Sequence, residues 1–441
     1  MPRPALRAAL AVSALALIPA ASATFAAVDS TTYRELDAFM AVFERVRGDY
    51  VDRTDDKKLI KGAIDGMLAS LDPHSGYLDA RDFQQMRTQT DGEYGGLGLT
   101  VTLEDGAVKV VTPTEDTPAF KAGIKAGDFI THLDGKLIFG GTLDEAVEQM
   151  RGKPGTAIKL TIVRSGRDKP FDVALTRQII ELKPVKWEVR GQVGYININA
   201  FSKNTGSSVR AALVSIDKSL GRHPLGYVVD LRSNPGGLLD EAVSVSDQFL
   251  DRGEIVSQRG REKRDIERFF AKTGDGAHGL PIVVLVDAGS ASAAEIVAGA
   301  IQDNHRGIVM GEKTFGKGSV QTLIPLDDTT ALRLTTARYY TPSGKSVQEG
   351  GIEPDIIVPQ LSDPDYKSRP RFREADLRKH LINEAKVDNS VLEDDTRPDP
   401  RFTATAEQLK ARGVTDFQLN YALETIARLA KAPASQVAAR R

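Results

Sequence analysis

Apolar residues in the second half of the chain follow two patterns, one typical of buried strands and one typical of helices. Residues 280–287 (LPIVVLVD) form a continuous apolar run, as expected for a strand covered on both faces. A second such run lies at residues 226–232, and residues 291–301 have helical composition and spacing. Because strands and helices alternate in this way from residue 179 to about 359, the sequence predicts an α/β domain there.

The first part of the chain after residue 29 is predicted to be helical. Between residues 30 and 93, apolar side chains recur at helical spacing in two stripes. The first stripe consists of Leu36, Phe39, Met40 and Phe43, and the second of Leu59, Ile64, Met67 and Leu68. Packing within the chain is the simplest interpretation of both stripes, and self-association is the alternative.

The C-terminal segment differs in composition. Residues 361–400 are rich in charge and proline, which predicts a linker that is partly disordered. A last helix is predicted at about residues 417–430, with one apolar face formed by Leu419, Ala422, Ile426 and Leu429. This face either docks onto the body of the protein or serves oligomerisation.

Ser292 lies at the predicted turn from strand to helix. Unpaired N–H groups and the helix dipole at such a position favour a developing negative charge, so this serine is well placed to attack a carbonyl. The alternative is an ordinary helix N-cap. A second turn, at residues 233–237 (SNPGG), ends in Gly236 and Gly237, which let the backbone approach a ligand and present an N–H group. A simple tight turn is the alternative for this pair.

Lys317 lies in a glycine-flanked segment, residues 311–325, that leads into a predicted strand. If residues 317–323 are extended, Lys317, Ser319 and Gln321 share one face, and Gln321 could hold the lysine amine by a hydrogen bond. Lysine normally titrates at about 10.4, and burial lowers this pKa toward roughly 7 to 8. A neutral Lys317 could then take the proton from Ser292. A solvated lysine on an edge strand is the alternative.

Several other classes of chemistry find no support. Gly311, Gly316 and Lys317 match the start of a phosphate-binding loop, but Gly318 stands where Ser or Thr is needed, so nucleotide binding is not expected. A net charge of -2 argues against nucleic-acid binding, and zero cysteines exclude disulfides and thiol nucleophiles. The 6 histidines show no metal-binding spacing, so neither a metal nor another cofactor is predicted.

The first 27 residues have the features of a signal peptide. Arg3 and Arg7 precede an apolar stretch at residues 9–18, and Ala21-Ser22-Ala23 is a small-residue cleavage pattern, although cleavage after Ala27 also fits. We therefore expect an exported protein of the bacterial periplasm or cell envelope. An uncleaved membrane anchor and a cytoplasmic protein with an apolar tail are the alternatives.

Taken together, the motifs resemble those of the C-terminal processing peptidases, tail-specific serine peptidases with a Ser-Lys-Gln site. The matching segments are residues 230–238 (DLRSNPGGL), 289–299 (GSASAAEIVAG), 316–321 (GKGSVQ), 340–345 (YTPSGK) and 351–356 (GIEPDI). The resemblance implies that Ser292 is the nucleophile, Lys317 the general base and Gln321 its orienting partner. It also implies that the N–H groups of Ala293 and Gly237 form the oxyanion hole. Many relatives carry serine at the position of Ala294, which has no catalytic role in the pattern.

Residues 94–178 resemble a PDZ domain, because residues 95–99 (GGLGL), 117–128 (TPAFKAGIKAGD) and 133–135 (LDG) match its pattern. The N–H groups of Leu97, Gly98 and Leu99 are then expected to bind the terminal carboxylate of a peptide. A helix at residues 143–150, with Leu143, Val147 and Met150 on one face, is predicted to form the other wall, so that a substrate tail adds as a strand. A barrel without ligand is the alternative.

Arg151 follows this helix directly. One hypothesis is that it couples a filled groove to the Lys317–Gln321 segment, and the alternative is that it only neutralises the helix C-terminus.

The sequence therefore predicts a multidomain α/β protein. Its parts are a signal peptide (1–27), an N-terminal helical region (28–93), a PDZ β-barrel-like domain (94–178), a protease core (179–360), and a linker with a C-terminal helical region (361–441). The resemblance implies a ClpP/crotonase-like core sheet and a homo-oligomer. We expect an exported serine endopeptidase that acts on proteins with free C-terminal tails, and the need for an adaptor protein is left open. A non-catalytic PDZ scaffold of the cell envelope and an acyl-CoA enzyme are the alternatives.

Overall fold

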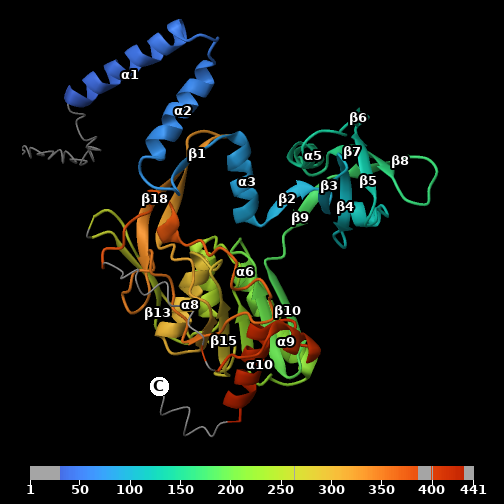
Figure 1. Ribbon diagram of the computed structural model, residues 1–441, viewed down its shortest axis with the longest axis vertical. Helices are drawn as coiled ribbons and strands as arrows, with labels where there is room; N and C mark the ends of the chain where they lie inside the picture. Colours follow the sequence, from blue (N-terminus) through green and yellow to red (C-terminus); the bar gives the residue numbers. More distant parts are fainter. Residues whose placement is uncertain (1–29, 263, 386–398, 400, 432–441) are drawn as a thin grey trace, which may run out of the picture. The chain divides into compact units, whose positions relative to one another are not determined.

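The computed structural model describes residues 30–262, 264–385, 399 and 401–431 (Figure 1). The chain divides into two compact units between Gly66 and Met67. Residues 1–27, for which a signal peptide is predicted, lie outside the described residues. Within the described ranges, no helix combines the length and the apolar character that crossing a membrane requires.

The N-terminal unit consists of helix α1 (Ser30–Asp49) and most of helix α2 (Asp56–Leu68). Leu36, Phe39 and Met40, which belong to the first predicted apolar stripe, are 52%, 46% and 50% exposed. Packing within this unit therefore does not account for the stripe. The expected burial of this stripe is therefore not observed within the N-terminal unit.

The second unit contains a smaller domain, inserted near its start, and a larger domain, and it begins with the elements that connect them. Strand β1 (Gly76–Leu78) and helix α3 (Ala80–Asp91) come first. Strand β2 (Glu93–Gly96) then pairs antiparallel with β9 (Gln178–Glu181), the strand by which the chain leaves that domain.

The smaller domain is an antiparallel sheet with two helices. Its strands are β3 (Leu99–Glu104), β4 (Ala107–Pro113), β5 (Phe129–Leu133), β6 (Lys136–Leu137), β7 (Ala157–Val163) and β8 (Phe171–Thr176), in the order β3-β4-β5-β7-β8 with β6 beside β5. Its helices are α4 (Pro118–Lys121) and α5 (Leu143–Met150). Thr142 and Glu145 form a capping box that fixes the start of α5. Fully buried Ile130, Leu160 and Ile162 form the centre of this domain's own core.

The larger domain is built on a six-stranded sheet in the order β10-β11-β12-β15-β16-β19. These strands are β10 (Val185–Arg190), β11 (Val193–Ile198), β12 (Tyr227–Asp230), β15 (Ile282–Val286), β16 (Ile308–Gly311) and β19 (Ile356–Ile357). All neighbours are parallel except β10 and β11. The apolar runs predicted as buried strands are β12 and β15, at the centre of this sheet.

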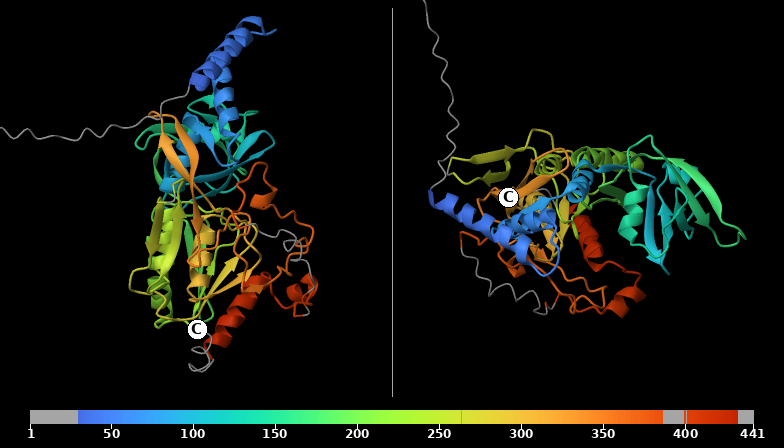
Figure 2. Two further views of the ribbon diagram at one scale, coloured as in Figure 1. Left: turned by 90° about the vertical axis from the view of Figure 1, so that its left-hand side faces the viewer. Right: turned by 90° about the horizontal axis from the view of Figure 1, so that it is seen from above.

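Helices cover both faces of this sheet, as Figures 1 and 2 show. Val229 and Val284 face a core shared with α6 (Thr205–Leu220), α7 (Leu239–Asp247) and α8 (Ala293–Asp303). Val228 and Val283 face the other way, onto α10 (Phe417–Leu429), whose Ala422 and Ile426 are fully buried. Docking onto the body thus explains the apolar face of the last helix. The double burial is also the reason for continuous rather than alternating apolar runs.

A second, antiparallel sheet lies beside the first. It contains β1, β18 (Ala331–Tyr340), β13 (Glu254–Arg259) and β14 (Ile266–Phe270) in that order, and β17 (Ser319–Pro325) pairs with β18. The Asp327–Thr330 turn joins β17 to β18, as the sequence predicts.

The prediction of a partly disordered linker at residues 361–400 is wrong for much of the described part of this range. This part includes the short helix η1 (Glu374–Asp376), and a further helix, α9 (Ala406–Ala411), precedes α10. Glu374 and Asn383 are buried, at 0% and 3% exposed. The charged composition is misleading because these polar groups are paired inside the protein: Glu374 accepts a hydrogen bond from Gln348 and contacts His74, and Asn383 donates to the carbonyl of Gln348.

Candidate active site

One cavity of about 800 Å³ brings together the residues singled out by the sequence motifs. Ser292, Ala293, Gly237, Lys317 and Gln321 all line it. Ser292 follows β15 and Gly237 follows β12, so both come from the carboxyl ends of neighbouring parallel strands, where open α/β sheets place their ligand sites. Lys317 precedes β17 and Gln321 lies within it.

Ser292 has an unusual backbone conformation, with φ 55° and ψ −114°. Ser292 is the N-cap residue of α8, but an ordinary N-cap residue is extended, so capping alone does not account for its conformation. A non-glycine residue held at positive φ costs of order 1–3 kcal/mol and persists only where its surroundings enforce it. Here the Ser292 N–H donates to Glu295 Oε2 (2.8 Å), and its carbonyl accepts from the Tyr339 hydroxyl (3.2 Å). The turn thus presents a half-buried serine to the cavity.

Glu295 connects the turn at Ser292 to the segment that carries Lys317 by hydrogen bonds to both. Its fully buried carboxylate accepts the N–H groups of Ser292 (2.8 Å), Gly316 (2.8 Å) and Lys317 (3.0 Å), and the Thr314 hydroxyl (2.5 Å). Burial raises the pKa of Glu295 to about 7, although these hydrogen bonds work in the opposite direction. Glu295 is not among the residues predicted from the motifs, although a Glu three positions after a serine at a helix start is a capping-box signature.

Tyr339 reinforces the same connection. It is buried, and its hydroxyl donates to the carbonyl of Lys317 as well as to that of Ser292. Burial raises the pKa of Tyr339, and the nearby Glu295 and Glu374 add to the effect, so the hydroxyl remains a donor. The main chains of the predicted nucleophile and the predicted base are therefore fixed by one carboxylate and one phenol.

Two backbone N–H groups beside Ser292 are available as donors. Among the described residues, the N–H groups of Ala293 and Gly237 have no hydrogen-bond acceptor. The Gly236 N–H, in contrast, donates to Asn234 Oδ1 (2.8 Å). The structure therefore favours Gly237 within the glycine pair, and Gly236 serves close packing, because a Cβ added there would lie 2.8 Å from Ser292 Cβ.

Lys317 is partly buried at the cavity wall. Burial lowers the pKa of its amine, and nearby Arg333 lowers it further, while Glu374, Glu295 and Asp72 act against this shift. A lowered pKa raises the neutral fraction of the amine, which is the form that accepts a proton. Within the described part of the chain, no hydrogen bond joins the Lys317 amine to the Ser292 hydroxyl.

Gln321 does not make the predicted contact with Lys317. The strand begins only at Ser319, and a bulge between Val320 and Gln321 breaks the expected alternation of faces. The Gln321 amide instead donates to Ser319 Oγ (3.0 Å) and Thr335 Oγ1 (3.2 Å). Gln321 still lines the cavity, but the structure connects it to the neighbouring strand rather than to the lysine amine.

The segment at residues 72–75 supports this side of the cavity. Asp72 accepts hydrogen bonds from Ser75 (2.8 Å) and from Thr335 Oγ1 (3.1 Å), the same hydroxyl that binds Gln321. Although burial alone would raise it, the pKa of Asp72 is lowered by these and the backbone hydrogen bonds. His74 Nε2 lies 2.9 Å from the fully buried Glu374 carboxylate. Residues far apart in sequence thus form one polar wall.

The carboxylate-binding loop predicted in the smaller domain has the expected open donors. Gly98 has φ 76°, and among the described residues neither the Leu97 N–H nor the Gly98 N–H has an acceptor, while Leu99 begins β3. Val147 of α5, from the helix predicted as the other wall, lines a separate groove of about 850 Å³. This groove is bounded by α3, β2 and α5 and does not include residues 97–99.

Arg151 occupies the C-cap position of α5. Its guanidinium lies over the Tyr94 ring, 4.8 Å from the ring centroid, and lines the groove rather than the catalytic cavity. Coupling between Arg151 and the Lys317–Gln321 segment stays a prediction.

Three family profiles match the chain. These are "Peptidase family S41" over residues 192–358, "PDZ domain" over residues 95–175, and "Activating protease CtpB N-terminal domain" over residues 18–82.

Similar proteins extend over most of the chain. It is 54% identical over 362 residues to the carboxy-terminal-processing protease of Bartonella bacilliformis, which covers 82% of this chain and 83% of that protein. It is 35% identical over 348 residues to the carboxy-terminal processing protease CtpB of Bacillus subtilis, covering 78% of this chain and 71% of that protein. Among solved structures, the photosystem II D1 C-terminal processing protease is 30% identical, with a TM-score of 0.43, covering 75% of this chain and 94% of that one.

Proposed function

The chain belongs to the carboxy-terminal processing proteases of peptidase family S41 and is a serine peptidase with a PDZ domain, and from this premise we propose how it acts. This membership confirms the family, the multidomain α/β fold and the peptidase activity predicted from the sequence. The proposal is that Ser292 and Lys317 hydrolyse peptide bonds of proteins whose C-terminal tails the PDZ domain binds. The observation that carries it is the tie through Glu295, which fixes Ser292 and Lys317 at one cavity beside two unpaired N–H groups.

The first half of the reaction forms an acyl-enzyme. Neutral Lys317 takes the proton from Ser292 Oγ, and the oxygen attacks the carbonyl carbon of the scissile bond. The N–H groups of Gly237 and Ala293 stabilise the resulting oxyanion. Collapse of the tetrahedral intermediate breaks the C–N bond, and protonated Lys317 donates its proton to the leaving amine.

The second half releases the acyl group. A water molecule enters in place of the amine, gives a proton to Lys317 and attacks the ester carbonyl carbon, and the same two N–H groups hold the second oxyanion. When the ester C–O bond breaks, the proton returns to Ser292 Oγ. Gln321 orients this side of the cavity through Ser319 and Thr335 rather than by direct contact in the resting structure.

Tail capture belongs to the PDZ domain, since such domains bind peptide C-termini by strand addition. The unpaired N–H groups of Leu97 and Gly98, with that of Leu99 beside them, are suited to a terminal carboxylate. The catalytic cavity carries apolar side chains, among them Phe83, Ile296 and Val320, so it suits an apolar stretch of substrate. Tethering the tail raises the local concentration of the scissile segment at Ser292.

Export to the bacterial periplasm or cell envelope is a further part of the proposal, supported by the signal-peptide pattern of residues 1–27. Cell fractionation with mass spectrometry of the mature N-terminus tests it. An intact Met1 on cytoplasmic protein would contradict it.

Self-association through the N-terminal helices is also proposed. The half-exposed side chains of Leu36, Phe39 and Met40 support this, because an apolar stripe left uncovered within its unit favours a second copy. Analytical ultracentrifugation of the purified chain and of a Phe39→Glu variant measures it, and a monomeric wild type would refute it. No surface is assigned to an adaptor, and activity of the purified chain alone would show that none is required.

The decisive experiment compares wild type with Ser292→Ala and Lys317→Ala on a model protein that ends in an apolar tail, with the terminal carboxylate free or amidated. We expect cleavage by wild type alone, and weaker cleavage of the amidated substrate. Cleavage that survives Ser292→Ala would refute the nucleophile. Equal cleavage of both substrates would refute carboxylate recognition while leaving the catalytic residues in place.

A further inference from the structure

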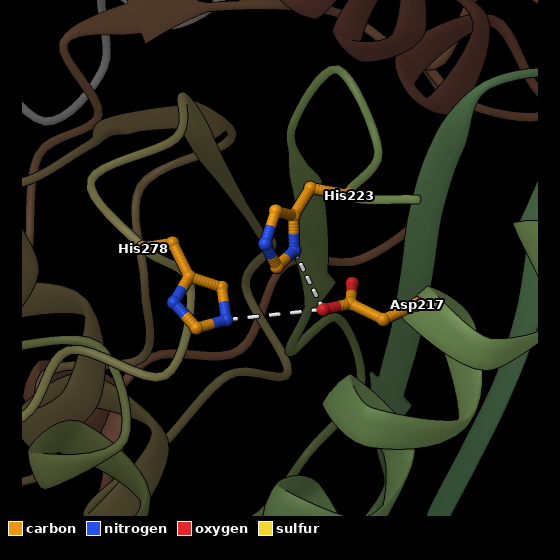
Figure 3. Close-up of side chains that lie close together, drawn as sticks. All are labelled: Asp217, His223 and His278. Carbon is orange, nitrogen blue, oxygen red and sulfur yellow. Dashed lines mark hydrogen bonds and ion pairs between the residues drawn. The ribbon is translucent and has the colours of Figure 1, made fainter. Parts of the chain in front are cut away.

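Two histidines and an aspartate lie close together (Figure 3). They gather at the edge of the six-stranded sheet opposite the catalytic cavity. Asp217 lies in α6, His223 in the turn between α6 and β12, and His278 in the loop that precedes β15. These segments lead into the amino ends of β12 and β15, whereas Gly237 and Ser292 follow the carboxyl ends of the same strands. The cluster is therefore separate from the site described above.

The three side chains converge on one point. His223 Nδ1 lies 2.7 Å and His278 Nε2 lies 3.8 Å from the same oxygen, Asp217 Oδ2, and the rings are 4.3 Å apart between centroids. In the described part of the chain, this is the only group of three or more His, Cys, Asp or Glu whose ligand atoms all lie within 4.8 Å of one another. Tetrahedral zinc with ligands at about 2.0–2.2 Å separates its ligand atoms by roughly 3.3 Å, a value between the two observed distances.

The aspartate is held in place from behind. The Tyr227 hydroxyl donates to Asp217 Oδ1 (3.0 Å), which leaves Oδ2 turned toward the two histidines. Tyr227 itself is fully buried in the core. A hydrogen bond of this kind to the second oxygen of a carboxylate is what orients such ligands in metal sites.

The loop that carries His278 is also fixed. The Asp275 carboxylate accepts the N–H groups of Ala277 (2.8 Å) and Gly279 (2.9 Å), and the Arg306 side chain (3.0 Å). Between these two residues His278 adopts φ 54°, a conformation that non-glycine residues rarely take. The loop thus holds one imidazole beside another, with both rings about half exposed, at 58% and 52% for the side chains of His223 and His278.

An ion pair alone explains this arrangement poorly. Both imidazoles face a single oxygen, Asp217 Oδ2, and the 3.8 Å from His278 Nε2 to that oxygen is too long for a hydrogen bond. A divalent cation instead uses the neutral form of both rings and the charge of the carboxylate at once. We propose that Asp217, His223 and His278 bind a divalent transition-metal ion of the zinc type, with water in the remaining position.

The role that follows is structural. An ion at this point would add a link between the turn after α6 and the loop before β15, which already meet where the Tyr227 N–H donates to the carbonyl of Pro281 (2.9 Å). His223 and His278 are 55 positions apart in sequence (278 − 223). A shared ion would therefore restrain the chain much as a disulfide does in other proteins, and this chain has no cysteines to form one. This ion lies at the far ends of the strands that carry the catalytic turns, so it acts on stability and not on the chemical step.

The test uses the full chain, freed of metal with a chelator and titrated with zinc alone. We expect about one zinc per chain by calorimetry and elemental analysis, and a higher melting temperature with zinc. His223→Ala and His278→Ala should each weaken binding at least about 10-fold and abolish the temperature shift. His305→Ala is the matched control, because His305 is also exposed and also has φ 54°, and it should bind like wild type.

Cobalt provides a second, spectroscopic measurement, since visible absorption bands typical of tetrahedral coordination should appear in wild type and in His305→Ala only. Failure of the metal-free wild type to bind zinc would overturn the proposal. Undiminished binding by His223→Ala and His278→Ala would also overturn it, by placing the ion elsewhere. Because both rings are half exposed, these variants should fold, and circular dichroism checks that they do.

Discussion

At the scale of single residues, the proposed mechanism depends on how the protein controls two protons, one on Lys317 and one on Glu295. Burial lowers the pKa of Lys317 and raises that of Glu295. Both shifts favour the neutral form, and the two residues are in contact through the Lys317 N–H. The same desolvation that favours a neutral Lys317, as the proposed base requires, therefore makes the Glu295 carboxylate costly to ionise.

The pH dependence of hydrolysis should follow Lys317. As a base it acts in the neutral form, so kcat/KM should rise with pH through a pKa below the 10.5 of an ordinary lysine and then level off. Lys317→Arg should be inactive at every pH, since guanidinium stays protonated. The exposed Lys345→Arg is the control and should retain the wild-type profile. An inflection at 10.5 or above, or an active Lys317→Arg, would disprove the assignment.

Glu295 should make the protein less stable as the pH rises. Its folded pKa of about 7 lies above the ordinary 4.5, so its stabilising contribution is complete below 4.5 and is lost as the pH rises through 7. Wild type and Glu295→Gln should therefore differ in melting temperature by an amount that changes across this window. Glu295→Gln should also lose activity. One amide oxygen cannot accept hydrogen bonds from all four donors, and each buried donor left without an acceptor costs about 1–3 kcal/mol of folding free energy.

The exposed Glu115→Gln serves as the control for this comparison, and its melting temperature should run parallel to that of wild type. A constant difference between wild type and Glu295→Gln from pH 4.5 to 7 would mean that the carboxylate stays ionised throughout.

At the scale of elements, regular structure follows the sequence pattern, and side-chain contacts do not. The apolar runs and their spacing predict β12, β15 and α10, because burial on one or both faces requires apolar residues at regular positions. The bulge in β17 has no such sequence pattern and is not predicted. It changes the direction of the side chains, and the contact expected between Gln321 and Lys317 is absent. Long-range pairs such as His74 with Glu374 depend on tertiary packing alone.

The turn after β12 should be intolerant of any side chain at Gly237. This residue has φ 145°, and an added Cβ would lie 2.1 Å from the carbonyl oxygen of Phe201. Gly237→Ala must therefore shift the N–H away from the oxyanion, which should lower kcat roughly 100-fold or more. Gly191→Ala is the matched control, since Gly191 also has positive φ but open space around it.

Labelling of Ser292 by a serine-reactive phosphonate and the melting temperature distinguish a displaced turn from an unfolded protein. Full activity of Gly237→Ala would show that the oxyanion is held by other donors.

At the scale of the whole molecule, the question is whether the PDZ domain only tethers the substrate or also controls the catalytic site. The domain has its own hydrophobic core, so a change at its surface need not disturb the protease core. Tethering alone raises the local concentration of a tailed protein and leaves the chemistry of a short peptide untouched. The two roles therefore predict different behaviour for two kinds of substrate.

Val147→Glu places a charge on the face of α5 that is predicted to form one wall of the tail-binding site, and it should weaken tail binding. If the domain only tethers, KM for a tailed protein should rise at least about 10-fold, while hydrolysis of a short peptide without a tail stays as in wild type. Gln149→Glu, which adds the same charge to the same helix outside this face, should change neither. A parallel loss on the short peptide would instead show that the domain controls the catalytic site.

The Arg151→Ala variant tests whether Arg151 transmits such control. If Arg151→Ala loses activity on the short peptide without weaker tail binding, Arg151 transmits the signal from the PDZ domain. If Arg151→Ala cleaves both substrates like wild type, the residue only caps α5.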